Sequence, residues 1–189
     1  YRVETTFNSP EDEGLFGLGQ PQDGISNRKG SNRRLENNNT DIAVPFLASS
    51  RGYGLLWDNT SRSDFTGGEE QNTKYRYVSQ GGDLVDYYFF YGPSIDEVIR
   101  GYRDATGAAP MFPKWAYGLF QSKDHYQSQA EILAVKDGYR DANIPVDAIV
   151  QDWRYWAPYA WGSHYFDEDR YPDPGALVDA IRRARATPW

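Results

Sequence analysis

The stretch WAYGLFQSKDHYQSQAEILAVKDGYRDANIPVDAIVQ, residues 115–151, predicts a strand, a helix and a second strand in that order. Its two ends, Trp115–Gln121 and Val146–Gln151, are short apolar runs that indicate strands. Between them, Ser128 and Glu131 have the spacing of a capping box that begins a helix. The connection is long enough for a right-handed crossover, so this part of the chain predicts a parallel sheet.

A further helix follows, so two strand–helix units fit into residues 113–189. Asn143 ends the first helix and Pro145 blocks its extension, while Asp173 and Pro174 are an N-cap followed by proline at the first helical position. A complete (β/α)8 barrel needs roughly 250 residues, which exceeds the length of this chain. The faces that the two helices would bury carry Ile132, Val135 and Tyr139, and Leu177, Ile181 and Ala184.

Residues 1–92, on the N-terminal side, show the turn signals and apolar runs of an antiparallel β-sandwich. Ala43–Ser49 and Tyr53–Asp58 flank a short turn that contains glycine, which predicts a hairpin. Lys74–Val78 and Leu84–Tyr91 flank a second polar turn and are predicted to form another hairpin. Several strands at this spacing favour a sandwich.

Two segments interrupt this β pattern. The polar stretch Gly19–Asp41 has no apolar period and predicts a loop that is either disordered or functional. Residues 93–112 predict a linker helix and a domain boundary, because Ser94 and Glu97 form a capping box and Gly107 ends the helical pattern. One face of this helix would carry Ile95, Val98, Ile99 and Tyr102.

Composition excludes several classes of function. The chain has no cysteine, two histidines and a net charge of −7, which argue against disulfides, a zinc site and a nucleic-acid-binding surface. No run approaches the ~18 apolar residues of a membrane span. We therefore predict no metal or other cofactor, no nucleic-acid partner and no membrane partner. The aromatic share of 16 % is high and has two interpretations, a sugar-binding surface or the filling of a β-sheet core.

Two loops at the ends of the predicted parallel strands carry the residues that could do chemistry. Ligands meet parallel sheets at the carboxyl ends of the strands, which places Ser122–Tyr126 and Asp152–Trp156 at one edge. The second loop gathers a carboxylate, a guanidinium and three aromatic rings, and Asp152 directly follows its strand. In the structural alternative, Arg154 stacks on a ring and Asp152 only caps the backbone.

A glycosidase needs a pair of carboxyl groups, roughly 5–5.5 Å apart for retention or 6.5–9.5 Å for inversion. Asp147 and Asp152 are five positions apart on one strand, and this odd spacing sends their side chains to opposite faces of a regular strand. Asp124 and Asp152 end neighbouring strands, and the sequence leaves open that they approach each other.

Seven motifs follow one another over nearly the whole chain. They are FGLGQ (Phe16–Gln20), NRKG (Asn27–Gly30), DIAVPFLASSRGYGLLWDN (Asp41–Asn59), FYGPSIDEVIRGYRDATG (Phe90–Gly107), PKWAYGLFQSK (Pro113–Lys123), GYRDANIPVDAIVQDWRYW (Gly138–Trp156) and FDEDRYPDPGALVDAI (Phe166–Ile181). Together they resemble glycoside hydrolase family 31, the α-glucosidase and α-xylosidase family, and they look most like its bacterial α-xylosidase branch.

The resemblance implies a galactose-mutarotase-like β-sandwich followed by the first two units of a (β/α)8 barrel. It implies retaining hydrolysis of a terminal α-linked xylose or glucose from the non-reducing end of an oligosaccharide or glycoside, without a metal. Asp152 matches the family carboxylate that binds sugar hydroxyls, and Trp153 is a further substrate-binding candidate. By the same resemblance, Asp41 or the Asn37–Asn39 run would reach the sugar from the N-terminal domain, and Tyr126 would either wall the site or be an ordinary core or surface residue.

One departure from the family pattern limits what the chain is expected to do. The family's nucleophile ends the fourth barrel strand and its acid/base comes later, whereas only two barrel strands are recognisable here. We therefore expect a fragment that lacks both catalytic carboxylates, with a C-terminal part of low stability. A free-standing carbohydrate-binding sandwich without catalysis is the alternative. The sequence leaves open whether the sugar is xylose or glucose and which linkage is cleaved. It also leaves open the oligomeric state and the compartment.

Overall fold

A computed structural model describes residues 1–186, with side chains for residues 1–183, and divides the chain into two compact units. The first unit comprises Tyr1–Ala109, and the second begins at Pro110. The division lies inside the segment 93–112, which the sequence marks as a boundary. Thr187, Pro188, Trp189 and the side chain of Ala184 lie outside the described residues.

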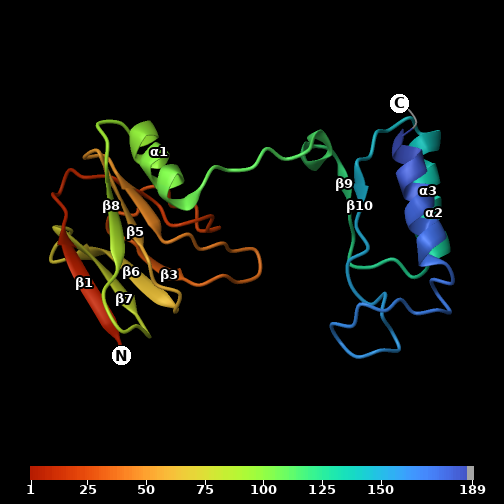
Figure 1. Ribbon diagram of the computed structural model, residues 1–189, viewed down its shortest axis with the longest axis horizontal. Helices are drawn as coiled ribbons and strands as arrows, with labels where there is room; N and C mark the ends of the chain where they lie inside the picture. The colour runs from red at the N-terminus through yellow and green to blue at the C-terminus, as the bar shows by residue number, and fades with distance from the viewer. Residues whose placement is uncertain (187–189) are drawn as a thin grey trace. The chain divides into compact units, whose positions relative to one another are not determined.

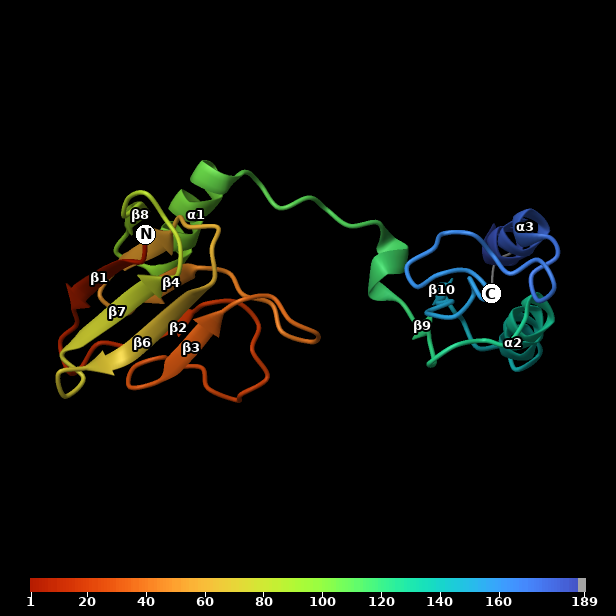
Figure 2. The ribbon, with the colours of Figure 1, turned by 90° about the horizontal axis from the view of Figure 1, so that it is seen from below.

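The first unit contains two four-stranded antiparallel sheets, and it confirms the predicted sandwich (Figure 1). The first sheet, whose strands lie side by side in Figure 2, has the order β1-β7-β6-β3, with bounds Val3–Asn8, Lys74–Ser79, Ser63–Glu69 and Asn32–Leu35. The second sheet has the order β2-β4-β5-β8, with bounds Leu15–Gly17, Phe46–Ser49, Tyr53–Trp57 and Tyr87–Tyr91.

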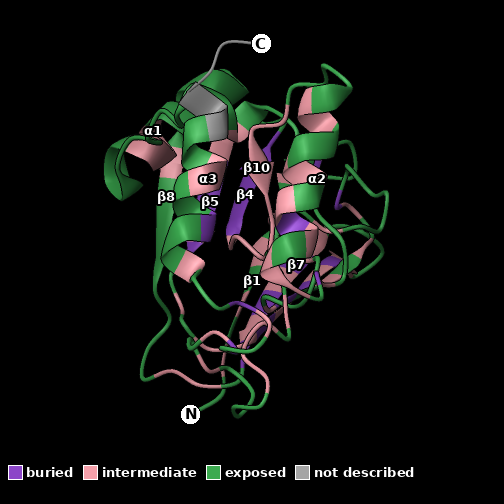
Figure 3. Cartoon of the chain, turned by 90° about the vertical axis from the view of Figure 1, so that its right-hand side faces the viewer, coloured by how far each residue is buried: buried purple, intermediate pink, exposed green. Residues whose placement is uncertain are grey.

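Large aromatic side chains fill the space between the two sheets. Trp57 and Tyr77 are fully buried, and their rings stack with centroids 5.2 Å apart. The indole Nε1 of Trp57 donates a hydrogen bond to Ser79 Oγ (2.8 Å), which satisfies its polar atom inside the core. On β7, Tyr75 and Tyr77 face inward as the alternation predicts. Buried residues, purple in Figure 3, are concentrated on strands such as β4 and β5.

Of the two predicted hairpins, the first is confirmed and the second is wrong. Strands β4 and β5 pair antiparallel around the turn that contains Gly52. Strand β7 pairs with β1 and β6, whereas β8 pairs with β5 in the other sheet. Residues 80–86 therefore carry the chain from one sheet to the other. The turn signals locate the bend correctly, but they cannot tell a hairpin from a crossing between sheets.

The polar stretch Gly19–Asp41, predicted to be a loop, contains the strand β3. This strand pairs with β6, and only Leu35 among its four side chains is buried. An edge strand with one buried side chain shows no apolar alternation, which is why its sequence looks like a loop. Charge pairs hold the flanking backbone, with Arg28 bound to Asp23 and Arg33 bound to Asp41.

The helix α1, Ile95–Thr106, packs on the second sheet of the sandwich. Its capping box is complete, since Ser94 Oγ accepts from the Glu97 amide and the Glu97 carboxylate accepts from the Ser94 amide. Val98 is fully buried, and Tyr102 stacks on Phe46 with ring centroids 4.2 Å apart. The other two predicted positions on this face, Ile95 and Ile99, are exposed.

In the second unit, the two predicted strands form a short parallel pair. Strand β9, Phe120–Gln121, pairs with β10, Ala148–Ile149, as the strand–helix–strand pattern predicts. Both are shorter than expected, and for β9 the reason is that residues Lys114–Tyr117 form the 3₁₀ helix η1 directly after Pro113. The apolar run at Trp115 is therefore mostly a helical turn, since periodicity alone does not identify the structure of a short apolar run.

Two helices accompany this strand pair, α2 at Gln129–Asp141 and α3 at Pro174–Ala186. Both lie on the same side of β9 and β10 in Figures 1 and 2. Ser128 caps α2 by accepting from the Glu131 amide, and Asp173 Oδ1 accepts from the Ala176 amide at the start of α3 (2.8 Å). The reciprocal half of the predicted box at Ser128 is missing, because the Glu131 carboxylate accepts from the Gln127 amide.

The core of the second unit lies between the strand pair and the two helices. Its buried residues are Tyr126, Ile132, Tyr171 and Leu177, with partly buried Val135 and Ile181 packed against them. Tyr139 is half-buried, and Asn143 has the left-handed backbone that ends a helix. Four buried side chains make a small core, and they include Ile132 and Leu177 from the predicted faces.

Candidate sugar-binding site

The loops that follow β9 and β10 form one site at the edge of the sheet. Because the two strands run parallel, both loops begin at the same edge, as expected for a ligand-binding end. The first loop carries Asp124 and His125, and the second carries Asp152 and Trp153. The structure thus confirms that the two predicted segments meet.

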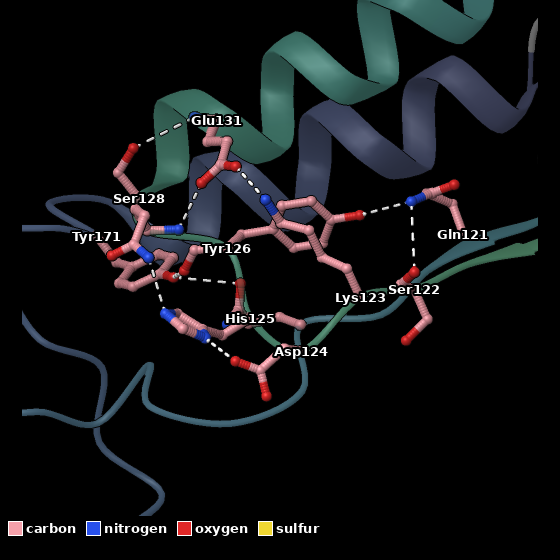
Figure 4. Close-up of polar contacts among 11 residues, drawn as sticks. Gln121, Ser122, Lys123, Asp124, His125, Tyr126, Ser128, Glu131 and Tyr171 are labelled. Carbon is pink, nitrogen blue, oxygen red and sulfur yellow. Dashed lines mark hydrogen bonds and ion pairs between the residues drawn. The ribbon is translucent and has the colours of Figure 1, made fainter.

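A chain of hydrogen bonds joins these loops. The indole Nε1 of Trp153 donates to Asp124 Oδ1 (2.5 Å), and the other carboxylate oxygen lies 2.6 Å from His125 Nδ1. His125 Nε2 in turn lies 2.8 Å from Gln127 Nε2 (Figure 4). Because the Gln127 amide nitrogen can only donate, His125 Nε2 accepts from it, which leaves Nδ1 as the ring nitrogen that donates to Asp124.

These contacts keep Asp124 ionised. The indole hydrogen bond from Trp153, followed by the hydrogen bond from His125, lowers the pKa of the Asp124 carboxyl below its ordinary value. A general acid needs the opposite shift, toward neutral pH. Asp124 is therefore suited to hold neighbouring groups in place, and its environment opposes a role as proton donor.

A second set of contacts holds the backbone of the first loop (Figure 4). Lys123 Nζ lies 2.5 Å from Glu131 Oε1, and Glu131 Oε2 accepts from the Gln127 amide at 2.5 Å. The hydrogen bond from Lys123 lowers the pKa of Glu131. The start of α2 thus fixes the loop that carries Asp124.

Asp152 is exposed and lies in the second loop of this site, next to Trp153. Within residues 1–186, the structure shows no hydrogen bond or ion pair that engages its carboxylate. A carboxylate with free lone pairs can accept hydrogen bonds from two sugar hydroxyls. The structural alternative, in which Asp152 caps the backbone, is not what the structure shows.

Aromatic rings surround the neighbouring side chain of Trp153. The Arg154 guanidinium lies 4.9 Å from the centre of its ring system, as the stacking alternative for Arg154 predicts. Trp161 also contacts Trp153, with ring centroids 5.8 Å apart, and is 79 % exposed. Trp156 contacts Trp161 edge-on at 5.4 Å. Trp161 is not among the residues predicted from the sequence, although three tryptophans in one loop are a signal that could have identified it.

Tyr126, a candidate for the wall of the site, lies instead in the core of the second unit. Its side chain is 1 % exposed and packs with Ile132, Tyr171 and Leu177. The hydroxyl accepts from Gln121 Nε2 (3.1 Å), and the Tyr171 hydroxyl donates to its backbone carbonyl (2.6 Å). This is the core alternative, so the candidate site is built without Tyr126.

Asp41 belongs to the first unit and is held by an arginine. The two guanidinium nitrogens of Arg33 contact the two Asp41 carboxylate oxygens at 2.9 and 2.5 Å. This hydrogen bonding lowers the pKa of Asp41. In the preceding run, Asn37 Oδ1 accepts from the Ala43 amide (2.7 Å), so its amide oxygen is used to shape the loop.

Asp147 lies at the opposite end of the strand from Asp152. Its Oδ2 accepts from the Leu119 amide at 3.3 Å, where the chain enters β9. This placement agrees with the prediction that Asp147 and Asp152 do not form a catalytic pair.

No helix among residues 1–186 has the length and apolar character needed to cross a bilayer. No group of three or more histidine or carboxylate side chains there is arranged to hold a metal ion.

Known families match both units of the chain. Residues 1–65 match the glycosyl hydrolase 31 N-terminal galactose mutarotase-like domain. Residues 109–188 match the glycosyl hydrolases family 31 TIM-barrel domain. A free-standing sandwich module would not contain this second domain.

Individual relatives agree with these matches. An α-xylosidase of Saccharolobus solfataricus is 43 % identical over 195 aligned residues, which cover 98 % of this chain and 26 % of the relative. The solved structure of a family 31 α-xylosidase from a soil metagenome, complexed with xylose, has a TM-score of 0.90 at 33 % identity, over 97 % of this chain and 26 % of that one. A Flavobacterium johnsoniae family 31 dextranase complexed with glucose has a TM-score of 0.84 at 29 % identity, over 97 % and 23 %.

The chain spans about a quarter of the length of the relatives that it matches. Over that quarter, four observations indicate the same family: the sequence motifs, the sandwich, the parallel strand pair and the two domain matches. The chain belongs to glycoside hydrolase family 31.

Proposed function

We propose that this chain contributes part of the sugar site of a retaining, exo-acting α-glycosidase that acts on a terminal α-linked xylose or glucose. The observation that carries the proposal is the exposed carboxylate of Asp152, which no side chain or backbone amide among residues 1–186 engages, beside the hydrogen-bonded ring of Trp153 at the carboxyl end of β10. Carboxylates that accept from hydroxyls, next to aromatic faces, suit the recognition of a sugar ring.

Within this proposal, Asp152 accepts hydrogen bonds from hydroxyls of the terminal sugar, and Trp153 bounds the site on one side. The charge-assisted hydrogen bonds fix the sugar's orientation, because two neighbouring hydroxyls can bind one carboxylate. Asp41, on the first unit, is a separate candidate for binding a sugar hydroxyl, and its pairing with Arg33 keeps it ionised and oriented.

Xylose is the preferred sugar in this proposal. The support is a difference in identity. The α-xylosidase of Saccharolobus solfataricus is 43 % identical to this chain, whereas an α-glucosidase of Bacillus thermoamyloliquefaciens is 28 % identical. A titration of the 189-residue chain with methyl α-xyloside, methyl α-glucoside and methyl β-xyloside, followed by tryptophan fluorescence, tests this. We expect the α-xyloside to bind most tightly, and equal binding of all three sugars would contradict the proposal.

Hydrolysis by the 189 residues alone is not expected. A retaining enzyme needs two carboxyl groups about 5–5.5 Å apart, one of them with a raised pKa. Asp124 is engaged by Trp153 and His125, and its pKa is shifted downward. The release of p-nitrophenol from p-nitrophenyl α-xyloside measures this directly. Turnover above the buffer blank that is abolished in Asp152→Ala would contradict it.

A further inference from the structure

The hydrogen bonds between the two loops assign a task to Asp124 that extends the proposed sugar site. Asp124 and Trp153 are 29 residues apart in the sequence, and their side chains form the hydrogen bond that joins the loop after β9 to the loop after β10. Trp153 is the residue next to Asp152. Any constraint on the Trp153 ring therefore also constrains the peptide that orients the Asp152 carboxylate.

The contacts around Asp124 leave its carboxylate little freedom. One oxygen accepts from Trp153 and the other contacts His125 Nδ1, whose ring is held from its far side by Gln127. The ring of His125 also meets that of Trp153 edge-on, with centroids 5.7 Å apart. The carboxylate is thus placed from two directions, although 68 % of its side chain remains exposed.

An exposed carboxylate that serves only solubility needs no such arrangement. Hydrogen bonds to a charged acceptor are stronger than neutral ones, and they hold the indole in one orientation. Ordering the side chains before the ligand arrives reduces the entropy lost on binding. The geometry at Asp124 is that of a group that prepares its neighbours for a ligand.

We propose that Asp124 is a positioning residue of the sugar site, which holds Trp153 through its indole N–H and thereby fixes where Asp152 presents its carboxylate. This inference rests on the proposed function. It adds a residue that does not itself touch the sugar, and it identifies the loop after β9 as the support of the site.

Two substitutions of Asp124 separate positioning from general stability. Asp124→Ala removes both hydrogen bonds. In Asp124→Asn, the side-chain carbonyl oxygen still accepts from the Trp153 indole. The new amide nitrogen can donate to His125 Nδ1 if the imidazole proton moves to Nε2 and the Gln127 amide rotates so that its oxygen accepts. The asparagine variant therefore retains a weaker, neutral form of the link and serves as the conservative rescue.

The indole N–H resonances of the ¹⁵N-labelled 189-residue chain report the link. The Trp153 resonance, assigned with Trp153→Phe, is expected at low field in the wild type, displaced partway in Asp124→Asn, and at the position of a solvated indole in Asp124→Ala. Trp57, which donates to Ser79 in the first unit, is the internal reference and should not move. A wild-type Trp153 resonance already at the solvated position would overturn the inference.

Binding of methyl α-xyloside gives the functional readout. We expect affinity about tenfold weaker in Asp124→Ala and intermediate in Asp124→Asn, since a charge-assisted hydrogen bond that orders the loop is lost or weakened. Unchanged affinity in Asp124→Ala, with the indole resonance displaced, would overturn the positioning role alone. If the wild type shows a low-field Trp153 resonance but no response to the sugar, the proposed function fails, and the inference fails with it.

Discussion

At the scale of single residues, Gly17 shows how closely the sandwich is packed. Its φ of 109° is a conformation that side chains rarely adopt, and a Cβ there would lie 2.6 Å from the Phe46 carbonyl oxygen of the neighbouring strand. We expect Gly17→Ala to lower the free energy of unfolding by about 3 kcal/mol. Urea denaturation followed by circular dichroism measures this.

The matched control is Gly138, which is exposed inside α2 and has open space around its Cβ position. Gly138→Ala should stabilise the helix by about 0.5–1 kcal/mol, because alanine restricts the unfolded chain and favours helix. If both substitutions lower the free energy of unfolding, or if neither does, close packing around Gly17 is not the reason why that position excludes a side chain.

The core tyrosines predict how the sandwich responds to alkali. Burial raises the pKa of Tyr53 to about 12 and also raises the pKa values of Tyr75 and Tyr77 above the ordinary 10.0. Because the folded state holds these phenols neutral, their contribution to stability is complete below pH 10 and is lost as the pH rises through 12. Tyrosinate absorbance should therefore show these residues ionising only together with loss of the β-sheet circular dichroism signal. Ionisation of all fifteen tyrosines near pH 10 with the sheet intact would contradict this.

At the scale of secondary structure elements, the capping box of α1 is a local device with a measurable effect. Ser94 Oγ and Glu97 satisfy each other's backbone amides at the helix start. Ser94→Ala should lower the free energy of unfolding by about 1 kcal/mol. Glu97→Gln should cost much less, because the amide oxygen still accepts from the Ser94 amide. Chemical denaturation of the two variants side by side decides this, and equal losses would argue against the box.

The elements that could be predicted from the sequence are those with local signals. Ser94 and Asp173 mark helix starts because a short polar side chain satisfies free amides there, and Asp152 follows an apolar strand. Strand β3 could not be predicted, since only Leu35 of its four residues is buried. The pairing of β8 with β5 instead of β7 depends on contacts distant in sequence, which periodicity does not encode.

The same distinction applies to the site. The meeting of the two loops follows from parallel strands, and the exposed Asp152 agrees with its position after β10. The bond between Trp153 and Asp124 depends on side-chain geometry across 29 residues, so no spacing rule predicts it. Tyr126 illustrates the opposite case, because an aromatic residue in a functional loop and one in the core look alike in a sequence.

At the scale of the whole molecule, the two units have cores of different size. Among the residues whose side chains are described, 1–183, nine buried residues form the main cluster of the sandwich and four form that of the second unit. Both helices of the second unit lie on one side of β9 and β10, and Leu119 and Phe120 are exposed. A small core with uncovered apolar side chains is expected to be only weakly stable.

Limited proteolysis tests this difference in stability. With a protease that cleaves after aromatic residues, we expect rapid digestion beyond Pro110 and a persistent fragment that ends at Trp115, the first aromatic residue after α1 that is not followed by proline. Mass spectrometry of the time course identifies the fragments. Equal persistence of residues 114–189 and 1–91 would show that the second unit is as stable as the sandwich.

Calorimetric titration with methyl α-xyloside determines whether Asp152 is a sugar-binding carboxylate of this chain. Asp152→Asn is compared with Asp147→Asn, which changes a carboxylate at the opposite end of the same strand. We predict wild-type affinity in Asp147→Asn and a loss of about tenfold or more in Asp152→Asn, the cost of replacing a charged acceptor. Equal affinity in the wild type, Asp147→Asn and Asp152→Asn would contradict the account.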